Sequence, residues 1–412
     1  MVGEPELGEP ELGEPEVGEP ELGEPELGGV PAGTLQHGRR LAAAAGQALR
    51  RLCGDGVDVE VDRDAVTAHL LLPLVVAVAT GTEVAAAPPQ PWPVGDGYVC
   101  ADLGAEGDRD AFVRLLESLG TDLPGAEELA VRAQEWRLPV TPYRRRAKVA
   151  TAGCRSPDDI PGAPAMRGLP DVDLARPLEG VTVVDLTIMW AGPLCTSILA
   201  GLGARVLKVE PDCRLDGTRF SPGGWLYQAL NREKVRVPLD LRAAGDRGAF
   251  FDVVAEADLV IDNFSPRVAP NLGIEPVDLQ RVKRGVAVLA LPAFPPGAQR
   301  HWVSYGTGVH AWSGLGDLGN GEMAAPTVTY PDPLAGLAGV GCALRLLAAG
   351  RRGASGALVG EVPLASVVGP LLEVPISDAL RRAVDDRLVR RLARMFGPIP
   401  PCPLRMSTGS KA

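Results

Sequence analysis

In the second half of the chain, short apolar runs alternate with segments whose apolar residues recur at helical spacing. The apolar runs are rich in Val, Ile and Leu, which is typical of strands buried on both faces of a parallel sheet. The alternation predicts an α/β fold with a doubly wound, Rossmann-like parallel sheet, in which ligands bind at the carboxyl ends of the strands. The predicted strands are 181–186, 205–209, 235–241, 259–262 and 286–291, and the predicted helices include 194–202 and 246–255.

Toward the N-terminus the pattern changes, and a small α/β region precedes the predicted sheet. Helices are predicted at 41–53 and 108–119, and a short strand at 97–100. Asp108 is expected to cap the second helix. An apolar run at 70–79 contains a proline and is shorter than the roughly 20 residues of a membrane span, so we interpret it as buried core.

Composition divides the chain into five parts. The predicted linker between the two folded regions is rich in Pro, Gly, Asp and Ala, and its apolar residues follow no periodic pattern. The predicted parts are an acidic repeat at 1–29, a small α/β region at 34–146, a linker at 147–177, a doubly wound domain at 178–370, and a C-terminal helix and tail at 371–412.

The net charge of −11 comes almost entirely from the N-terminal repeat. Its five units of the Gly-Glu-Pro-Glu-Leu type hold ten of the 52 acidic residues, which leaves 42 against 41 basic residues in the chain. A proline every five residues prevents a continuous helix, so we expect the repeat to be extended. The nearly neutral body lacks the basic stripe of a nucleic-acid-binding protein, and no nucleic-acid partner is expected.

The cysteines and histidines show no pattern of a metal site. The seven cysteines are scattered and never form a Cys-x-x-Cys pair, and the four histidines do not have metal-ligand spacing. The N-terminus has no cationic segment followed by an apolar one, the pattern of a secretory signal. We therefore expect a reduced, cytoplasmic protein with no metal ion and no membrane partner.

Three loops at the carboxyl ends of predicted strands are the expected ligand sites, 187–192, 210–218 and 263–267. The first lacks the Gly-x-Gly-x-x-Gly spacing of dinucleotide-binding proteins, which disfavours a nicotinamide or flavin cofactor. It still begins a helix, whose N-terminus favours an anion. Lys208 and Glu210 can be interpreted either as site residues or as solvated charges at the end of a strand.

A series of motifs runs through this half of the chain. The motifs are Leu178–Thr187, Ala191–Pro193, Leu207–Pro211, Leu230–Lys234, Leu239–Leu241, Ala255–Phe264, Ser313–Leu315 and Asp332–Gly336. In order and spacing they resemble the class III CoA-transferases, or CaiB/BaiF-like proteins, a group that includes formyl-CoA transferase, carnitine CoA-transferase and methylacyl-CoA racemase. The resemblance extends from residue 178 to about residue 370.

A second set of segments looks like the small domain of that family. These segments are 96–99, 108–120 and 137–142. The small domain follows the sheet domain in ordinary members but precedes it here, so the resemblance implies a divergent member that is permuted or a trimmed tandem. It also implies a homodimer or pairing with a related subunit.

The resemblance implies a CoA thioester as ligand, bound as a substrate and not as a tightly held cofactor. The implied CoA-contacting residues are Met189, Trp190, Ala191, Leu239, Asp240, Leu241, Arg242, Asn263, Phe264 and Ser265. Among them, the Arg242 guanidinium could bind a phosphate as a planar fork of donors.

The sequence departs from the family at the catalytic position. Family transferases carry an aspartate that attacks the thioester carbonyl to form an anhydride. Aligning Tyr305 and Ser313–Leu315 with the family puts Gly306 at that position. Because glycine has no side chain, this covalent route is closed there.

Three other residues could compensate for the missing aspartate. His310, one helical turn further on, is either a general base for an α-proton or a structural histidine. Asp317, in a glycine-rich stretch, could swing toward the thioester or lie in a flexible surface loop. Asp332 is expected to cap the helix that starts at Pro333.

The expected function is transfer of CoA between an acyl-CoA and a carboxylic acid, which would be the two small-molecule partners. Two alternatives remain open. One is a catalytically degenerate CoA-binding homologue or partner subunit. The other is a racemase-like or dehydratase-like enzyme that transfers a proton next to the thioester.

Overall fold

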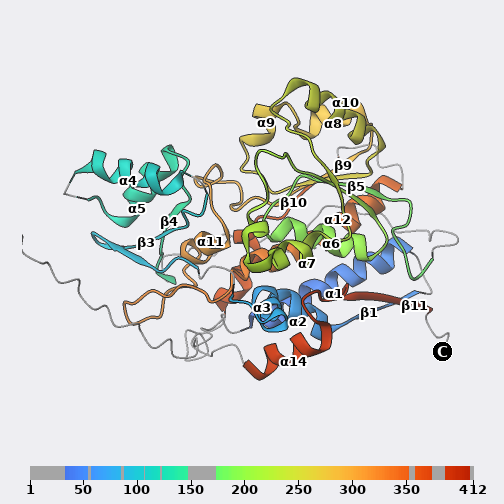
Figure 1. Ribbon diagram of the computed structural model, residues 1–412, viewed down its shortest axis with the longest axis horizontal. Coiled ribbons are helices and arrows are strands. Elements are labelled where there is room, and N and C mark those ends of the chain that lie inside the picture. The colour runs from blue at the N-terminus through green and yellow to red at the C-terminus, as the bar shows by residue number, and fades with distance from the viewer. Residues whose placement is uncertain are drawn as a thin grey trace, which may run out of the picture.

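The computed structural model describes residues 33–53, 57–84, 88–105, 107–120, 123–146, 173–351, 358–373 and 386–408. The acidic repeat and most of the predicted linker lie outside the described residues. Figure 1 shows a central sheet between layers of helices, with a smaller α/β unit beside it.

The central sheet has six strands, all parallel, in the order β10-β9-β8-β5-β6-β7. The chain enters at β5, adds β6 and β7 on one side, and then reverses to add β8, β9 and β10 on the other. This confirms the predicted doubly wound α/β fold, with its switch point between β5 and β8. The strands are β5 (Thr182–Asp185), β6 (Arg205–Val209), β7 (Val235–Val237), β8 (Leu259–Asp262), β9 (Ala287–Ala290) and β10 (Val359–Glu361).

The predicted strands agree with the structure to within one residue at each end, apart from the one expected at 235–241. That strand ends at Val237, because Pro238 has no N–H to donate to a neighbouring strand. The two predicted helices are present and begin earlier than expected, at Ala191 and Ala244.

Helices cover both faces of this sheet (Figure 1). Consecutive residues of β5 point to opposite faces, so Val183 joins the core beneath α6 and α12 while Val184 joins the core beneath α8. This explains why the strand sequences are apolar throughout. One face is covered by α6 (Ala191–Gly201), α7 (Trp225–Asn231) and α12 (Pro331–Arg351), and the other by α8 (Ala244–Glu256), α9 (Val268–Leu272) and α10 (Pro276–Val282).

Short helices connect these layers. They are α11 (Gly306–Trp312) and α13 (Leu364–Val367), with the 3₁₀ segments η3 (Gly217–Phe220), η4 (Pro222–Gly224) and η5 (Gly369–Glu373). Of these, α11 lies between the small α/β unit and α12.

The N-terminal helices pack on the core of the central sheet. Helix α1 (Thr34–Cys53), which begins before the predicted residue 41, lies along α12. Strand β1 (Val57–Val61) pairs antiparallel with β11 (Leu404–Thr408). Helices α2 (Arg63–Leu70) and α3 (Leu72–Thr80) hold the apolar run predicted to be core, which is mostly buried, and α14 (Asp386–Phe396) packs against them.

The described residues between 88 and 146 form a separate small α/β unit, at the left of Figure 1. Residues 34–80 and 88–146 therefore pack in different places, although the sequence suggested one region. The unit consists of an antiparallel sheet of β2 (Trp92–Val94), β3 (Gly97–Ala101) and β4 (Val140–Pro142), with helices α4 (Asp108–Leu119) and α5 (Ala126–Glu135).

Helix α4 has the predicted bounds but a different N-terminal cap. The cap is Gly107 in the left-handed conformation, with φ of 82°. The expected aspartate cap is wrong, because Asp108 is already the first helical residue.

The small unit is fixed to α11 by specific contacts. The Gln134 amide exchanges two hydrogen bonds with the backbone of Val303, with N···O distances of 2.9 and 2.7 Å. The Thr141 hydroxyl donates to the Gly308 carbonyl at 3.2 Å. The Arg144 guanidinium lies 4.9 Å from the centre of the Trp312 ring. These contacts place the end of the small sheet beside the start of α11.

Helix α12 is long and apolar enough to cross a membrane, as is the α2–α3 pair, which is bent by 90°. In α12, 83% of the most apolar window is buried inside the structure. Burial of this kind is also found in the core helix of a soluble domain.

The six cysteines among the described residues are free thiols, and four of them are buried. The seventh, Cys154, lies outside those residues. Within the part of the chain that the structure describes, no group of three or more His, Cys, Asp or Glu side chains could hold a metal ion.

Candidate functional site

The loop after β5 holds Met189 in a conformation that few non-glycine residues adopt. Its φ is 68°, in the left-handed region. The Met189 N–H donates to the two carboxylate oxygens of Asp216 at 3.3 and 3.2 Å. Asn263, at the end of β8, receives the Ile188 N–H at 3.0 Å and donates to the Ile188 carbonyl at 2.7 Å. Backbone strain that the surroundings enforce in this way is typical of ligand sites.

Buried charges support this loop from inside the fold. The Lys234 ammonium lies 2.9 Å from the Asp185 carboxylate, and both side chains are at most 1% exposed. The Lys208 ammonium donates to the Thr187 carbonyl at 2.7 Å and lies 3.4 Å from Asp216. Burial alone would raise the pKa of Asp185, but Lys234 and Lys208 lower it below its usual value.

Glu210 organises the loop after β6. Its carboxylate accepts hydrogen bonds from Arg219 at 2.6 Å and from Arg236 and Tyr227 at 3.2 Å each. The reading of Lys208 and Glu210 as solvated strand-end charges is wrong, because both are buried. They hold the two loops that flank the carboxyl ends of β5 and β6.

Arg242 lies at the surface beside the same edge of the sheet. Its guanidinium is paired with the Asp240 carboxylate at 2.8 Å and is 65% exposed. The hydrogen bond from Arg242 lowers the pKa of Asp240. A phosphate bound by Arg242 would therefore have to share or displace this carboxylate.

The remaining predicted CoA-contacting residues differ in how far their side chains are buried. The Trp190 side chain is buried in the core, and its Nε1 has no hydrogen-bond partner among the described residues. A ligand that binds at the loop containing Trp190 would therefore contact backbone atoms and not this side chain. Ala191 and Leu241 are also buried, whereas Leu239, Phe264 and Ser265 are half-buried.

His310 is buried in the middle of α11, and both of its ring nitrogens are engaged. The Tyr330 hydroxyl lies 2.6 Å from Nδ1, and Nε2 donates to the Ala324 carbonyl at 2.9 Å. Burial lowers the pKa of His310 to about 4. These contacts match the structural alternative for His310 and leave neither nitrogen available to a substrate.

Asp317 is buried in the loop after α11. Its carboxylate accepts the Arg146 N–H at 3.0 Å and the Gly319 N–H at 2.9 Å. Asp317 also lies 3.6 Å from the Arg145 guanidinium. The carboxylate therefore holds its loop against the end of the small unit, and the alternative of a flexible surface loop does not describe it.

Gly306 begins α11 and faces a carboxylate from another helix. A Cβ at this position would overlap Asp332 Oδ2 and would lie 3.0 Å from Asp332 Cγ and 3.3 Å from Thr329 Cβ. Asp332 does not cap α12 as expected, because the helix already begins at Pro331. Its carboxylate instead fills the space that a side chain at 306 would occupy.

A second carboxylate approaches the same place from the small unit. Asp102 follows β3 and accepts a hydrogen bond from the Thr307 hydroxyl. Burial raises the pKa of Asp102 and raises that of Asp332 to about 7, and Asp102 contributes to the increase at Asp332. Two carboxylates in a buried site favour a state in which one of them is protonated.

Helix α12 links this carboxylate pair to the strained loop. Gly336 stands one helical turn after Asp332, and a Cβ there would lie 2.7 Å from the Ala191 carbonyl oxygen. Residues four apart occupy the same face of a helix. Asp332 therefore lies on the face of α12 that meets the loop at 189–191.

Comparison with known proteins identifies the sheet domain. The model of the family described as CoA-transferase family III matches residues 178–380, which include all six parallel strands, α11 and α12. This match covers just under half of the chain. It confirms, for the matched residues, the family predicted from the motif series, and the small α/β unit lies outside them.

Named relatives align with part of the chain. It is 34% identical over 145 residues to the acetyl-CoA:oxalate CoA-transferase of Acetobacter aceti, an alignment that covers 34% of this chain and 37% of that protein. It is 33% identical over 186 residues to the succinyl-CoA–L-malate CoA-transferase alpha subunit of Chloroflexus aurantiacus, covering 41% and 43%. The chain therefore spans less than half the length of either relative.

A solved structure of the same type aligns over a similar part of the chain. A CaiB/BaiF family protein from Brucella suis gives a TM-score of 0.42 at 26% identity, covering 48% of this chain and 56% of that one. The family assignment comes from the sequence match and not from this superposition.

Sequence reasoning missed several residues that build the site. Asp216 and Lys234 were not predicted, although Lys234 ends one of the family motifs and so carried a usable signal. Asp102 stands in no recognised motif, and its role depends on the packing of the small unit against α11. The predicted residues Met189 and Asn263 do come together at the switch point.

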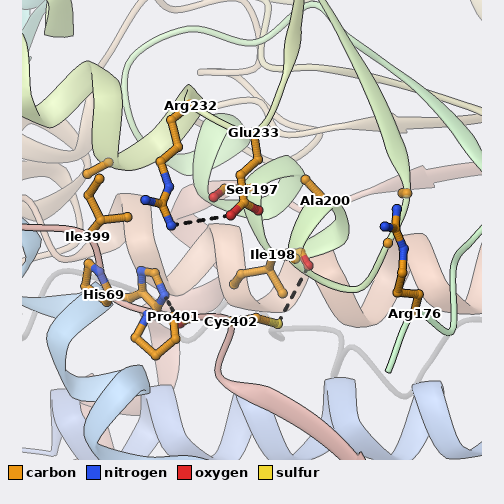
Figure 2. A pocket seen from close by; sticks show the side chains of 15 residues that line it. His69, Arg176, Ser197, Ile198, Ala200, Arg232, Glu233, Ile399, Pro401 and Cys402 are labelled. Carbon is orange, nitrogen blue, oxygen red and sulfur yellow. Dashed lines mark hydrogen bonds and ion pairs between the residues drawn. The ribbon is translucent and has the colours of Figure 1, made fainter. Parts of the chain in front are cut away.

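A cavity of about 480 Å³ lies away from these loops, at the end of the sheet where the parallel strands begin. Figure 2 shows His69, Arg232 and the segment around Cys402 lining it. The His69 Nε2 donates to the Pro401 carbonyl at 3.0 Å, and Arg232 is paired with its neighbour Glu233. The predicted CoA-contacting residues do not line this cavity.

The buried Asp332 carboxylate should make the folded protein less stable as the pH rises. A carboxyl group whose pKa is about 7 when folded and about 3.9 when unfolded favours folding below pH 4, and this contribution is lost as the pH rises to 7. We expect wild type to lose about 2–3 kcal/mol more unfolding free energy than Asp332→Asn between pH 5 and pH 8. Urea unfolding of both proteins at the two pH values measures this difference, and parallel curves would contradict it.

Proposed function

We propose that this protein transfers CoA between an acyl-CoA thioester and a carboxylic acid. The observation that carries the proposal is the strained loop around Met189, tied to Asn263 at the switch point between β5 and β8. Ligands of doubly wound sheets bind at this point. The match to CoA-transferase family III, which includes all six strands, supports the same assignment.

The loops suggest how CoA would be held. Helix α6 begins at Ala191, directly after the strained residue, and its first N–H groups favour the negative pyrophosphate. The exposed Arg242 guanidinium can form charge-assisted hydrogen bonds with a phosphate of the ligand. The thioester end would then extend toward α12, on the face that carries Asp332.

Calorimetric titration should detect CoA binding with a dissociation constant in the micromolar range, about −8 kcal/mol. Arg242→Met should weaken binding about fivefold to tenfold, because one charge-assisted contact contributes about 1 kcal/mol. Arg281→Met is the matched control, since Arg281 is also mostly exposed and paired with an aspartate, Asp278, but stands on α10. Absence of heat and of a thermal shift with CoA and several acyl-CoAs would contradict the assignment.

Transfer itself is tested by mass spectrometry of the CoA products. Acetyl-CoA and succinyl-CoA are offered as donors, and oxalate and L-malate as acceptors, because these compounds stand in the names of the relatives. We expect a new acyl-CoA that depends on both substrates. Hydrolysis to free CoA without a new thioester would contradict transfer.

A second candidate is a CoA-binding subunit without turnover. Gly306 favours it, because the first residue of α11 offers no side chain to react with a thioester. The two candidates separate in the experiments above: binding without exchange across the panel supports the subunit. A proton-transfer enzyme based on His310 is not favoured, because both of its ring nitrogens are engaged.

Other properties of the whole protein belong to this proposal. We propose a cytoplasmic location, since the cysteines of the described residues are free thiols. We propose that CoA acts only as a substrate, with no tightly bound cofactor. We also propose a homodimer or pairing with a related subunit, which light scattering at the CoA-binding concentration would test.

A further inference from the structure

The exposed side of α14 carries a stripe of arginines, which we call the basic stripe. Its members recur at spacings of three and four residues, which places them on one side of the helix, and all of them are exposed. They are Arg387, Arg390, Arg391 and Arg394. The opposite side of α14 is buried in the main core through Val389, Leu392 and Ala393.

The acidic residues of α2 do not satisfy the whole stripe. Arg391 donates to both carboxylate oxygens of Asp64, at 2.7 and 3.0 Å. Asp62 is occupied elsewhere, because it accepts two backbone N–H groups at the start of α2 and lies 3.6 Å from Arg405. Arg394 forms no ion pair with any of the described residues. Its guanidinium is therefore available to an anion from outside them.

The arginines at 144 and 145 are balanced by contrast. Arg144 pairs with Glu127 at 2.9 Å, and Arg145 lies 3.6 Å from Asp317. An anionic partner would gain less there, because it would have to displace a carboxylate that is already in place.

The chain itself contains a segment of the opposite charge. The repeat at 1–29 holds ten glutamates and no lysine or arginine. The two glutamates of each unit are two residues apart, which corresponds to about 6 Å in the extended chain predicted from the prolines. Arginines four residues apart on α14 are also about 6 Å apart along the helix axis. The two charge patterns are therefore complementary in sign and in spacing.

The repeat is joined to the fold close to α14. Helix α1 begins at Thr34, and in its second turn the Arg39 guanidinium donates to the Thr67 hydroxyl of α2 at 3.1 Å. One turn earlier in α2, Asp64 pairs with the stripe. Figure 1 shows α14 at the lower edge of the molecule, beside α2 and α3. The step from residue 29 to residue 34 spans up to about 18 Å, so the end of the repeat can reach the stripe.

We propose that the acidic repeat at 1–29 binds the basic stripe of α14 in the same molecule, with its glutamates accepting hydrogen bonds from the arginines. A single surface contact of this kind is weak. The short connection keeps the repeat at a high local concentration, and five similar units offer equivalent ways to bind. The contact should weaken as salt screens the charges. This inference does not rest on the proposed transfer of CoA.

Carbodiimide coupling of the full-length chain tests the contact. The reagent joins a carboxylate to an amine that touches it, and arginine does not react. Arg394→Lys places an amine in the stripe and keeps the positive charge. Mass spectrometry of the monomer should find position 394 joined to a glutamate of residues 1–29. The yield should fall at least about fivefold between about 0.05 and 0.5 M salt.

Arg281→Lys is the matched control for this cross-link. Arg281 is also mostly exposed and has an aspartate partner, but it stands on α10, on the other side of the central sheet. The native Lys283 beside it gives a reference in every sample. Both positions should couple to the repeat at least about fivefold less than position 394. Equal yields at 281 and 394 would overturn the proposal.

Arginine modification tests the wild-type side chains without a new amine. A phenylglyoxal reagent is applied to the full-length protein and to a variant in which the ten glutamates of the repeat are glutamines. We expect Arg394 to react at least about threefold faster in the variant, because its carboxylate partners are gone, whereas Arg281 should react at the same rate in both. Equal rates at Arg394 overturn the proposal and leave the stripe to another anionic partner. A cross-link found only between two molecules, with a yield that rises with protein concentration, overturns it in favour of a second copy of the chain.

Discussion

Replacing Lys234 with methionine should lower the free energy of unfolding by about 3–5 kcal/mol. The Lys234 ammonium uses all three of its donors, on the Asp185 carboxylate at 2.9 Å, the Pro193 carbonyl at 3.0 Å and the Asn231 side chain at 2.8 Å. Methionine has nearly the same length but no charge. Asp185, which is fully buried, would be left without its closest counter-ion.

Lys283→Met provides the matched control for this substitution. Lys283 lies 3.5 Å from Asp258, and both side chains are partly exposed to water. Pairs of that kind contribute at most about 1 kcal/mol, so we expect little change. Urea unfolding of the three proteins at pH 7 measures both effects. Equal losses in the two variants would show that the buried pair has no special role.

The buried Asp185–Lys234 pair also supports the loop after β5. Asp185 receives the Thr187 N–H at 2.9 Å, and Thr187 begins the loop that holds Met189. The double variant Asp185→Asn/Lys234→Met removes both charges and should recover part of the lost stability, because no unpaired charge remains. If the double variant is as unstable as Lys234→Met, the loss of stability comes from altered packing and not from an unpaired charge.

Replacing Gly336 with alanine should both destabilise the protein and weaken CoA binding. The new methyl group would lie 2.7 Å from the Ala191 carbonyl oxygen and 3.2 Å from the Leu194 side chain. Overpacking of this kind costs about 1–3 kcal/mol. The backbone of the loop at 189–191, which is proposed to bind CoA, has to move away from α12. We therefore expect CoA affinity to fall about tenfold, or 1.4 kcal/mol.

Gly248→Ala is the control for the glycine substitution. Gly248 lies on the exposed side of α8, where a Cβ would meet nothing within 4 Å. Alanine stabilises a helix interior by about 0.5–1 kcal/mol relative to glycine, so this variant should be slightly more stable with normal affinity. Thermal unfolding and calorimetry with CoA compare the two. If Gly336→Ala binds CoA with normal affinity, the contact between α12 and the loop at 189–191 does not control CoA binding.

The sequence by itself determined the architecture of the central sheet. The strands 205–209 and 259–262 were predicted with their observed bounds, because β-branched apolar runs between amphipathic segments depend on local burial and period. The strained loop at Met189 was located by the same reasoning, since the end of a strand at the switch point follows from strand order alone. The motif series added the family, which the match over 178–380 confirms.

Tertiary structure alone decided what the polar residues do. His310 and Asp317 have the side chains expected of catalysts, but their partners Tyr330, Ala324 and Arg146 are brought to them by other segments. Hydrogen bonds between distant residues leave no local period in a sequence. The same holds for β1 and β11, whose pairing joins segments more than 300 residues apart in the chain.

The Asp332 carboxylate, which lies against Gly306, shows most clearly what sequence and tertiary structure each determine. The sequence determined that position 306 has no side chain, and it could not determine what occupies the space. Asp332 lies there because α12 packs against α11, and Asp102 of the small unit acts electrostatically on the same carboxylate. Packing places side chains from separate elements in one volume, and that placement is set by the assembled core, not by neighbouring residues along the chain.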